Sequence, residues 1–154
     1  MNERNMPELE NVVEIREGQI NDAERISHLL TQLNYPVAAG FVEARLPYFI
    51  AHPDALLIVA TDSADELIGF VSLHFIPQLA LAGDFCRISY FCVSQQNRSL
   101  GVGRLLEEKV VEAARLRGCD RIELHCHKRR DRAHSFYFRQ GYTEDPKYLL
   151  KKLR

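Results

Sequence analysis

The sequence predicts a mixed α/β fold in which helices cover both faces of one central sheet. Two observations support this prediction. The middle of the chain holds short apolar, strand-like runs joined by turn residues, and the C-terminal part alternates strand and helix patterns. The length of 154 residues, with 46% hydrophobic and 27% charged residues, is typical of one globular domain. We therefore expect a flexible leader over residues 1–10 and a single domain over residues 11–154.

The first half of the chain is expected to contain a strand, two helices and three further strands. Asn21, with Glu24 three residues later, predicts a helix start, and Asn34-Tyr35-Pro36 predicts where that helix breaks. Turn residues 62–65 predict a hairpin. The predicted strands are Val12–Arg16, Leu56–Ala60, Leu67–Ile76 and Phe85–Val93, and the second helix is Phe41–Ile50.

The second half is expected to alternate helix and strand. An apolar stripe beginning at Val102 predicts an amphipathic helix that ends at Gly118. The elements predicted after it are a strand over Arg121–His127, a helix over Asp131–Gln140 closed by Gly141, and a final strand over Tyr148–Leu150.

The net charge of −1 hides an asymmetry between the two parts of the chain. Residues 1–97 carry 5 basic and 13 acidic side chains, whereas residues 98–154 carry 15 basic and 8 acidic ones. A basic half could meet a polyanion, but no aromatic-plus-basic nucleic-acid signature is present, so a small polyphosphate ligand fits better. No apolar run reaches the ~18 residues of a membrane span, and the start is acidic. We expect a cytoplasmic protein without nucleic-acid or membrane partners.

The cysteines do not predict a metal site. Cys86, Cys92, Cys119 and Cys126 form no CxxC pair, and three of them fall in apolar strand-like runs. We expect buried thiols, with Cys92 and Cys126 reduced. His125-Cys126-His127 resembles a metal-binding tripeptide, but in a strand the two histidines face away from the cysteine. No bound metal is therefore expected.

The segment between Val93 and the next helix has the features of an anion site. Gly101 and Gly103 allow close approach of a ligand to the backbone, and the helix start offers unpaired N–H groups and a partial positive charge. Arg98 and Arg104 add full charges at both edges. The alternative is a tight strand-to-helix turn with surface arginines. The segment is neither a Walker loop nor a Rossmann fingerprint.

Two motifs resemble those of the GCN5-related N-acetyltransferases. The first, Arg98-Ser99-Leu100-Gly101-Val102-Gly103, follows an apolar strand and opens a helix, and the second is Ala133-His134-Ser135-Phe136-Tyr137-Phe138-Arg139-Gln140-Gly141-Tyr142. The element order matches over nearly the whole chain. The resemblance implies a mostly antiparallel sheet of about six to seven strands, acetyl-CoA as cosubstrate, and a fold in which homodimers are common.

The resemblance also implies roles for individual residues. Backbone groups of Phe91 and Val93, on either side of Cys92, would pair with the pantetheine arm of acetyl-CoA. The N–H groups that would hold its pyrophosphate are those of Ser99, Leu100, Gly101, Val102, Gly103 and Arg104. Tyr137 takes the position of the general acid, because a phenol with a pKa of about 10 stays protonated at neutral pH. An ordinary half-buried aromatic residue is the alternative for Tyr137.

Two positions depart from the pattern of the family. Arg130 stands where an Asn often contacts the cofactor, and Tyr90 stands near the position of a Glu that acts as general base. Tyr90 cannot be a base at neutral pH without a large shift of its pKa. His74 is the alternative base, although a structural or solvent-edge histidine is equally open. An amine that arrives neutral could need no dedicated base.

The acceptor is left open between several classes. Lys128–Tyr137 and Ser72-Leu73-His74 look most like the aminoalkylphosphonate N-acetyltransferase branch, which implies a small primary amine bearing an anionic group. Aminoglycosides and polyamines remain alternatives, because the acidic first half could provide a cleft for cations, and protein acetylation is not excluded. A non-catalytic acetyl-CoA-binding regulatory module is an alternative of another class. Transfer is expected to be direct, in one ternary complex.

Overall fold

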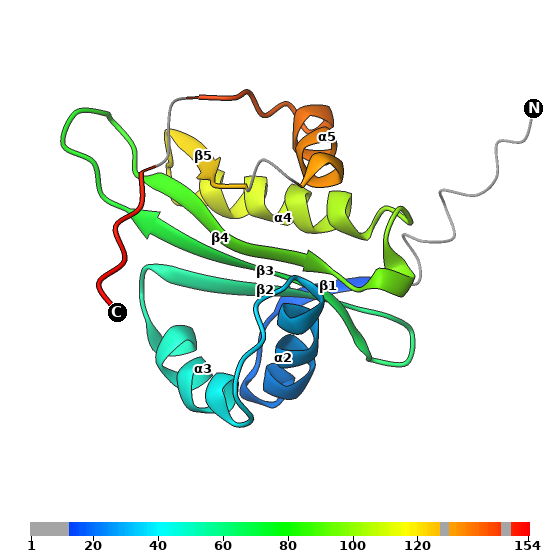
Figure 1. The fold of residues 1–154 in the computed structure, drawn as a ribbon. Helices are drawn as coiled ribbons and strands as arrows, with labels where there is room; N and C mark the ends of the chain where they lie inside the picture. The colour runs from blue at the N-terminus through cyan, green and yellow to red at the C-terminus, as the bar shows by residue number, and fades with distance from the viewer. Residues whose placement is uncertain (1–12, 127–129, 146–148) are drawn as a thin grey trace, which may run out of the picture. The chain divides into compact units, whose positions relative to one another are not determined.

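The computed structural model describes residues 13–126, 130–145 and 149–154. The chain divides into two compact units, Met1–Glu123 and Leu124–Arg154. The N-terminal unit contains nearly all of a sheet with helices on both of its faces (Figure 1), and the C-terminal unit contains one helix. None of the described helices combines the length and apolar character that a membrane span requires. The predicted leader, residues 1–10, lies outside the described residues, and the single domain over 11–154 stays a prediction.

The order of the elements follows the sequence pattern closely. They are β1 (Glu14–Glu17), the 3-10 helix η1 (Ile20–Asp22), α2 (Ala23–Gln32), α3 (Phe41–Ala51), β2 (Ala55–Thr61), β3 (Leu67–Ile76), β4 (Phe85–Val93), the 3-10 helix η2 (Gln95–Asn97), α4 (Val102–Leu116), β5 (Arg121–Leu124) and α5 (Asp131–Arg139). The predicted hairpin of β2 and β3 is confirmed, and β3 and β4 have the predicted bounds.

Within the described residues the sheet has five strands in the order β1-β2-β3-β4-β5. The first four are joined by antiparallel pairs. Arg87 bonds Glu123, with Nε 3.0 Å from Oε1, and Arg121 lies 4.8 Å from the centre of the Phe85 ring. Phe85 thus lies near Arg121 and Arg87 near Glu123, so β4 and β5 run in the same direction, as in a parallel pair. The sheet is therefore mixed and mostly antiparallel, as predicted, with five described strands where six to seven were expected.

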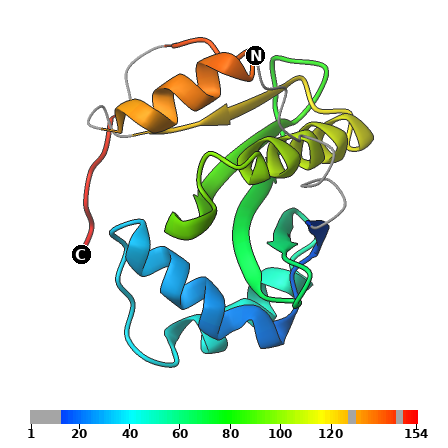
Figure 2. The same ribbon diagram turned by 90° about the vertical axis from the view of Figure 1, so that its right-hand side faces the viewer.

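Helices α2 and α3 cover one face of the sheet and α4 covers the other (Figure 2). The alternation along β3 explains this arrangement. A Cβ on Gly69 would lie 3.1 Å from Leu106 of α4, whereas Phe70 belongs to the apolar cluster beneath α2 and α3. That cluster consists of Ala23, Ile26, Leu29, Leu33, Val42, Leu46, Leu57, Val59, Leu67, Phe70 and Cys92.

Strand β4 carries one residue more than regular pairing with β3 requires. Leu73 pairs with Ile88 and Ser72 pairs with Tyr90, so Ser89 is the extra residue of a β-bulge. Ser72 lies on the same face of the sheet as Phe70, and Tyr90 therefore lies there too. The bulge thus directs the side chains near its centre toward the α2–α3 face.

The predicted start of the first helix is wrong. Asn21 lies inside η1, and α2 begins at Ala23 with Asp22 at its N-cap. The Asp22 carboxylate accepts hydrogen bonds from the Gln19 N–H at 2.7 Å and from both terminal nitrogens of Arg16 at 2.9 Å. These charged and backbone donors hold Asp22 at the turn, so the short helix η1 replaces the turn expected at Asn21.

Two further strand predictions are also wrong, one in its extent and the other at the two of its residues that the structure describes. The strand predicted over Arg121–His127 ends at Leu124, and His125 and Cys126 lie outside any strand, while His127 is not among the described residues. Leu149 and Leu150 form no strand, and Tyr148 is outside the described residues. Leu149 and Leu150 are exposed, so this apolar pattern does not mark a buried strand.

Candidate functional site

The predicted anion loop joins β4 to α4 through two left-handed residues. Ser99 has φ +64° and Gly101 has φ +89°, and α4 begins directly afterwards at Val102. The Leu105 N–H donates to the Gly101 carbonyl at 3.2 Å, so the amides of Val102 and Gly103 precede the first helical hydrogen bond. No heavy atom of the described residues lies within 4 Å of a Cβ built on Gly101. The helix start therefore faces open space on this side.

The two arginines of the loop are held by different partners. Arg98 donates from Nε to the Val93 carbonyl at 3.2 Å, and Arg104 forms an ion pair with Glu108 at 2.5 Å. The first bond uses the Val93 carbonyl and ties the loop to the end of β4, where the resemblance implies that backbone groups of Phe91 and Val93 pair with pantetheine. The Leu100 side chain is exposed, whereas Val102, the first residue of α4, is buried.

Gly69 sets the distance between the sheet and the start of α4. A Cβ at this position would lie 3.0 Å from the Cys92 carbonyl oxygen and 3.1 Å from Cδ1 of Leu106. Such contacts are tighter than ordinary packing allows. The absence of a side chain at Gly69 thus lets α4 lie directly on β3 and β4.

The α2–α3 face of the sheet has a polar part next to its apolar core. Ser72 and Ser89 lie with their hydroxyl oxygens 2.6 Å apart, and Nε2 of His74 lies 2.9 Å from Oγ of Ser89. Ser89 also donates to the Ser72 carbonyl at 3.2 Å, and the Tyr90 N–H donates to Oγ of Ser72 at 3.1 Å. His74, the predicted alternative base, and the backbone N–H of Tyr90 are therefore joined by this hydrogen-bond network.

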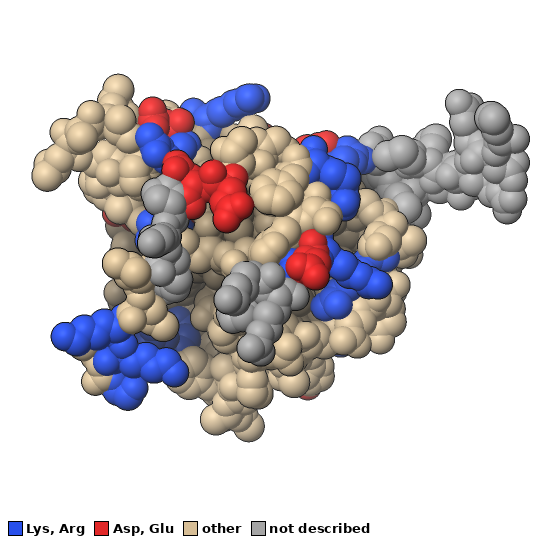
Figure 3. All heavy atoms as spheres, turned by 45° about the horizontal axis from the view of Figure 1, so that its top comes forward, with Lys and Arg blue, Asp and Glu red and all other residues tan. Residues whose placement is uncertain are grey.

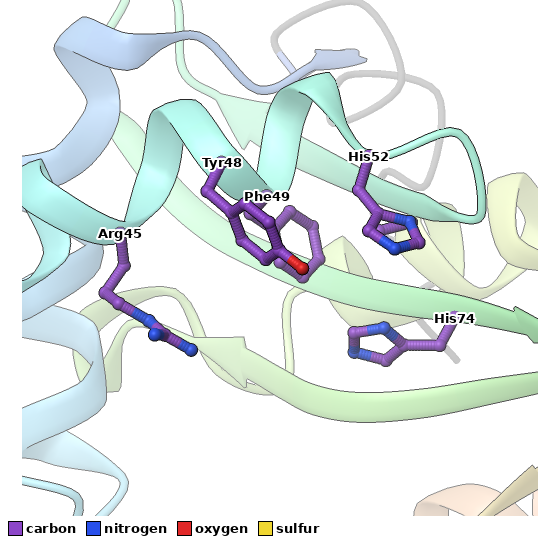
Figure 4. A pocket seen from close by; sticks show the side chains of 6 residues that line it. Arg45, Tyr48, Phe49, His52 and His74 are labelled. Atoms are coloured by element: carbon purple, nitrogen blue, oxygen red, sulfur yellow. The ribbon is translucent and has the colours of Figure 1, made fainter.

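A cavity of about 250 Å³ opens beside this network. Its lining comes from α3, the residue that follows it and the two strands β2 and β3, and consists of Arg45, Tyr48, Phe49, His52, Ala55 and His74. Figure 4 shows Arg45 on one side of the Tyr48 and Phe49 rings and the two histidines on the other. The Phe49 and His74 rings meet edge to face, with 5.4 Å between their centroids. His74 thus connects the cavity to the bulge in β4.

Arg45 is a charged side chain at the edge of the cavity. Arg45 pairs with no carboxylate among the described residues, and the six lining residues include no Asp or Glu. Burial, followed by the nearby His52 and Arg87, lowers the pKa of His74 below its usual value of 6.5. At neutral pH His74 is therefore a neutral imidazole with a lone pair to accept a proton.

His52 has a defined hydrogen-bonding state. Its Nδ1 accepts the Asp54 N–H at 3.1 Å. In the neutral ring the proton is therefore on Nε2, which can act as a donor. Arg45 and His52 are therefore both donors at the edge of the cavity.

Tyr90 is partly exposed on the same face as His74. Its ring meets Tyr35 edge to face, with 5.3 Å between centroids. Tyr35 lies in the connection between α2 and α3, which runs beside β4 here. The two aromatic rings provide contact surface, and neither supplies a carboxylate base.

The C-terminal unit contains Tyr137 and Arg130. Tyr137 is half-buried on α5, between the rings of Phe136 and Tyr142 at 5.3 and 5.4 Å. Burial is the main cause that raises the pKa of Tyr137, Cys126 adds to it, and Arg130 opposes it. The phenol is therefore protonated at neutral pH. Arg130 is exposed just before the helix, and its carbonyl accepts the His134 N–H at 3.1 Å.

All four cysteines are free thiols. Cys92 is buried and donates to the Leu29 carbonyl at 3.3 Å, and burial raises the pKa of Cys86 to about 12. Cys126 is only partly buried, so the expected full burial is wrong at that position. Among the residues that the structure describes, no three His, Cys, Asp or Glu side chains are grouped to hold a metal ion.

Acidic side chains partner some of the basic ones in the C-terminal half of the sequence. Figure 3 shows acidic side chains lying among basic ones on the face that it presents. On α4, Arg104 pairs with Glu108 and Lys109 pairs with Glu112. The excess of positive charge in residues 98–154 is thus partly compensated locally.

Arg45, His52 and Ser89 were not predicted from the sequence. Arg45 and Tyr48 lie three residues apart and share one face of α3, and His52 follows four residues later, directly after the helix. This spacing could have indicated a functional face. Ser89 had no such signal, because a bulge depends on how two strands pair.

The comparisons with known proteins agree with this architecture. A sequence profile described as the acetyltransferase (GNAT) family matches residues 22–142. A transcriptional regulator from Bacillus halodurans C-125 is 26% identical with a TM-score of 0.82, and the match covers 92% of this chain and 99% of that one. Glucosamine-6-phosphate N-acetyltransferase from Arabidopsis thaliana is 18% identical with a TM-score of 0.78 over 92% and 99% of the two chains. An aminoglycoside acetyltransferase from an uncultured soil metagenomic sample is 15% identical with a TM-score of 0.80 over 95% and 99%. The last two similarities concern the fold alone.

Proposed function

The chain belongs to the acetyltransferase (GNAT) family, and from this premise we propose that it acetylates the primary amine of a small molecule that also carries an anionic group, such as an aminoalkylphosphonate. Members of the family use acetyl-CoA as cosubstrate, and the chain is an N-acetyltransferase. The observation that carries the proposed acceptor class is the cavity beside His74.

The size of the cavity favours a small acceptor. A volume of about 250 Å³ lies below the roughly 300–1,000 Å³ of pockets that take drug-sized ligands. An aminoalkylphosphonate with a two-carbon chain is a correspondingly small acceptor. An aminoglycoside is several times larger and would have to extend beyond the cavity.

The charge of the cavity favours an anionic group on the acceptor. Arg45 and His52 provide donors, and no carboxylate lines the cavity to hold a second cation such as that of a polyamine. Hydrogen bonds between a guanidinium and a phosphonate or carboxylate are among the stronger ones in proteins. An anionic group held by Arg45 would leave the amine of the acceptor for the His74 end.

The loop before α4 is proposed to bind the pyrophosphate of acetyl-CoA. The left-handed turn at Ser99 and Gly101 presents the first amides of α4 to open space, where an anion is favoured. The residues proposed to contact the cosubstrate are Phe91, Cys92, Val93, Arg98, Ser99, Leu100, Gly101, Val102, Gly103, Arg104, Arg130 and Tyr137. Most of these assignments come from the family motifs, and the open helix start supports those in the loop.

Proton transfers complete the proposed reaction. His74, neutral at pH 7, accepts a proton from the amine as its nitrogen attacks the thioester carbonyl. The C–N bond forms, the C–S bond breaks, and Tyr137 donates its phenolic proton to the departing thiolate. Afterwards His74 releases to solvent the proton that it took from the amine, and Tyr137 takes up a proton from solvent. Both residues are thus restored for the next turnover. Both acyl transfer partners are present together, so no acyl-enzyme is required.

The acceptor class can be tested with a matched series of amines at saturating acetyl-CoA. The series is 2-aminoethylphosphonate, 2-aminoethanol and 1,2-diaminoethane, with released thiol as the readout. We expect at least a tenfold higher kcat/KM for the phosphonate. Arg45→Gln should raise its KM by roughly 10- to 100-fold, since a charged hydrogen bond contributes about 1.5–3 kcal/mol. The same variant should change kcat/KM for 2-aminoethanol less than twofold.

Arg115→Gln is the matched control. Arg115 is an exposed arginine near the end of α4, on the opposite face of the sheet. Its variant should behave as wild type with all three amines. If Arg45→Gln lowered kcat/KM equally for 2-aminoethylphosphonate and 2-aminoethanol, the result would contradict the anion-binding role of Arg45. Binding of acetyl-CoA without thiol release from any amine would instead favour the non-catalytic module.

A further inference from the structure

The hydrogen-bond network at the bulge has few protons to distribute. Ser72 and Ser89 each have one hydroxyl proton, and the Tyr90 amide contributes another. The contacts are Tyr90 N to Ser72 Oγ at 3.1 Å, Ser72 Oγ to Ser89 Oγ at 2.6 Å, Ser89 Oγ to the Ser72 carbonyl at 3.2 Å, and His74 Nε2 to Ser89 Oγ at 2.9 Å. The assignment of these protons determines the tautomer of His74.

One arrangement satisfies all four contacts together. The carbonyl of Ser72 can only accept, so Ser89 must use its proton for that bond. Ser72 accepts from the Tyr90 amide and then donates its own proton to Ser89. The oxygen of Ser89 has one acceptor position left, and the contact with His74 is a hydrogen bond only if Nε2 carries the imidazole proton. In the other tautomer Ser89 would have to abandon the Ser72 carbonyl.

We infer that Ser89, supported by Ser72, is a positioning residue that holds the imidazole proton on Nε2 of His74 and leaves Nδ1 as the nitrogen that accepts the proton of the acceptor amine. This inference rests on the proposed function, in which His74 is the base. No group of the described residues forms a hydrogen bond with Nδ1 of His74. That nitrogen therefore keeps its lone pair for the reaction.

The surroundings of His74 make the tautomer important. On β4 the nearest charged group is Arg87, which is paired with Glu123 of β5. From α3 and the residues after it, Arg45, Tyr48 and His52 line the same cavity. Since burial and the neighbouring His52 and Arg87 disfavour the imidazolium, His74 is neutral in the free protein. A neutral ring has only one basic nitrogen, and Ser89 selects which one it is.

The experiment combines nitrogen NMR of the free protein with kinetics of three variants. Two-bond proton–nitrogen spectra should show His74 with a protonated Nε2 and an unprotonated Nδ1 in the wild type. Ser89→Ala should lose this single tautomer and lower kcat about tenfold to a hundredfold, as small misplacements of catalytic groups do, with the KM for acetyl-CoA changed less than twofold. In Ser89→Ala the acidic limb of the pH dependence of kcat/KM should move to lower pH. The variant lacks the hydroxyl that accepts a hydrogen bond from the imidazolium, so the pKa of His74 falls.

Two further variants separate the role of the hydroxyl from effects on folding. Ser89→Thr keeps the hydroxyl and should restore the tautomer and most of the rate. Ser63→Ala removes an exposed serine from the turn between β2 and β3 and should match the wild type. A proton on Nδ1 in the wild type, or an unchanged kcat in Ser89→Ala, would overturn the inference. Failure of the proposed function has a different result, namely a wild type that releases no thiol with any amine.

Discussion

Gly101 and Gly40 form a natural pair for testing where acetyl-CoA binds. Each glycine is the N-cap of a helix, each has a left-handed backbone with φ of +89° and +79°, and neither would bring a Cβ within 4 Å of a heavy atom of the described residues. They differ in position, because Gly101 precedes α4 and Gly40 precedes α3. Replacement by alanine therefore imposes the same backbone strain at both places.

The expected cost in stability is similar for the two variants. A left-handed conformation costs an L-residue about 1–2 kcal/mol, and replacing glycine returns about 0.4–1 kcal/mol by restricting the unfolded chain. The net loss is about 1 kcal/mol, which lowers Tm by roughly 2–4 °C for a chain of this length. No steric term is added, since the space around both positions is open.

Acetyl-CoA affinity should separate the variants. In Gly101→Ala the new methyl group projects into the open space where the pyrophosphate is proposed to approach, so Kd should rise at least tenfold, which is about 1.4 kcal/mol. In Gly40→Ala it should stay within twofold of wild type. Titration calorimetry with acetyl-CoA measures the affinities, and thermal unfolding followed by circular dichroism confirms that both variants fold. Equal affinities in two cooperatively folding variants would refute the loop as the binding site.

Two other residues give predictions of different kinds. Tyr137→Phe should lower kcat roughly 10²-fold with little change in acetyl-CoA affinity, and initial rates with both substrates varied should intersect; full activity would show that another group supplies the proton. Burial opposes the ionisation of Asp22, but the bonds from Arg16 and the Gln19 N–H outweigh it and hold the pKa of Asp22 below its usual value. Asp22→Asn should therefore cost about 1–2 kcal/mol of unfolding free energy at pH 7 in urea titrations. This difference should shrink as the pH falls through the lowered pKa, because only the carboxylate is stabilised; a constant difference from pH 7 to pH 3 would contradict it.

Elements with a clear periodicity could be predicted from the sequence. Strands β3 and β4 are long apolar runs between turn residues, and their bounds are confirmed. Helix α4 has an apolar stripe and a left-handed Gly118 after its end, so both limits follow from local physics. The loop before it could be predicted because its glycines and arginines are consecutive in the chain.

Features that depend on pairing between distant segments could not be predicted. Ser89 becomes an extra residue only because Leu73 and Ser72 pair with its neighbours. Likewise, His74 was recognised as a titratable residue, but its cavity requires α3 to lie above β3. The predicted length of β5 was wrong because the alternating apolar pattern continues in the sequence beyond Leu124, where the strand ends.

The bulge in β4 also has a consequence for changes in chain length. Before it, Cys86 and Ile88 belong to the α4 face, and after it Phe91 and Val93 do, so the even and odd positions exchange faces at Ser89. A chain shortened by this one residue would alternate regularly from Phe85 to Val93, with every remaining side chain on its present face and opposite its present partner. The sheet itself could therefore be built without Ser89. Deletion of Ser89 would therefore remove the hydroxyl network while leaving the strand pairing that the fold requires.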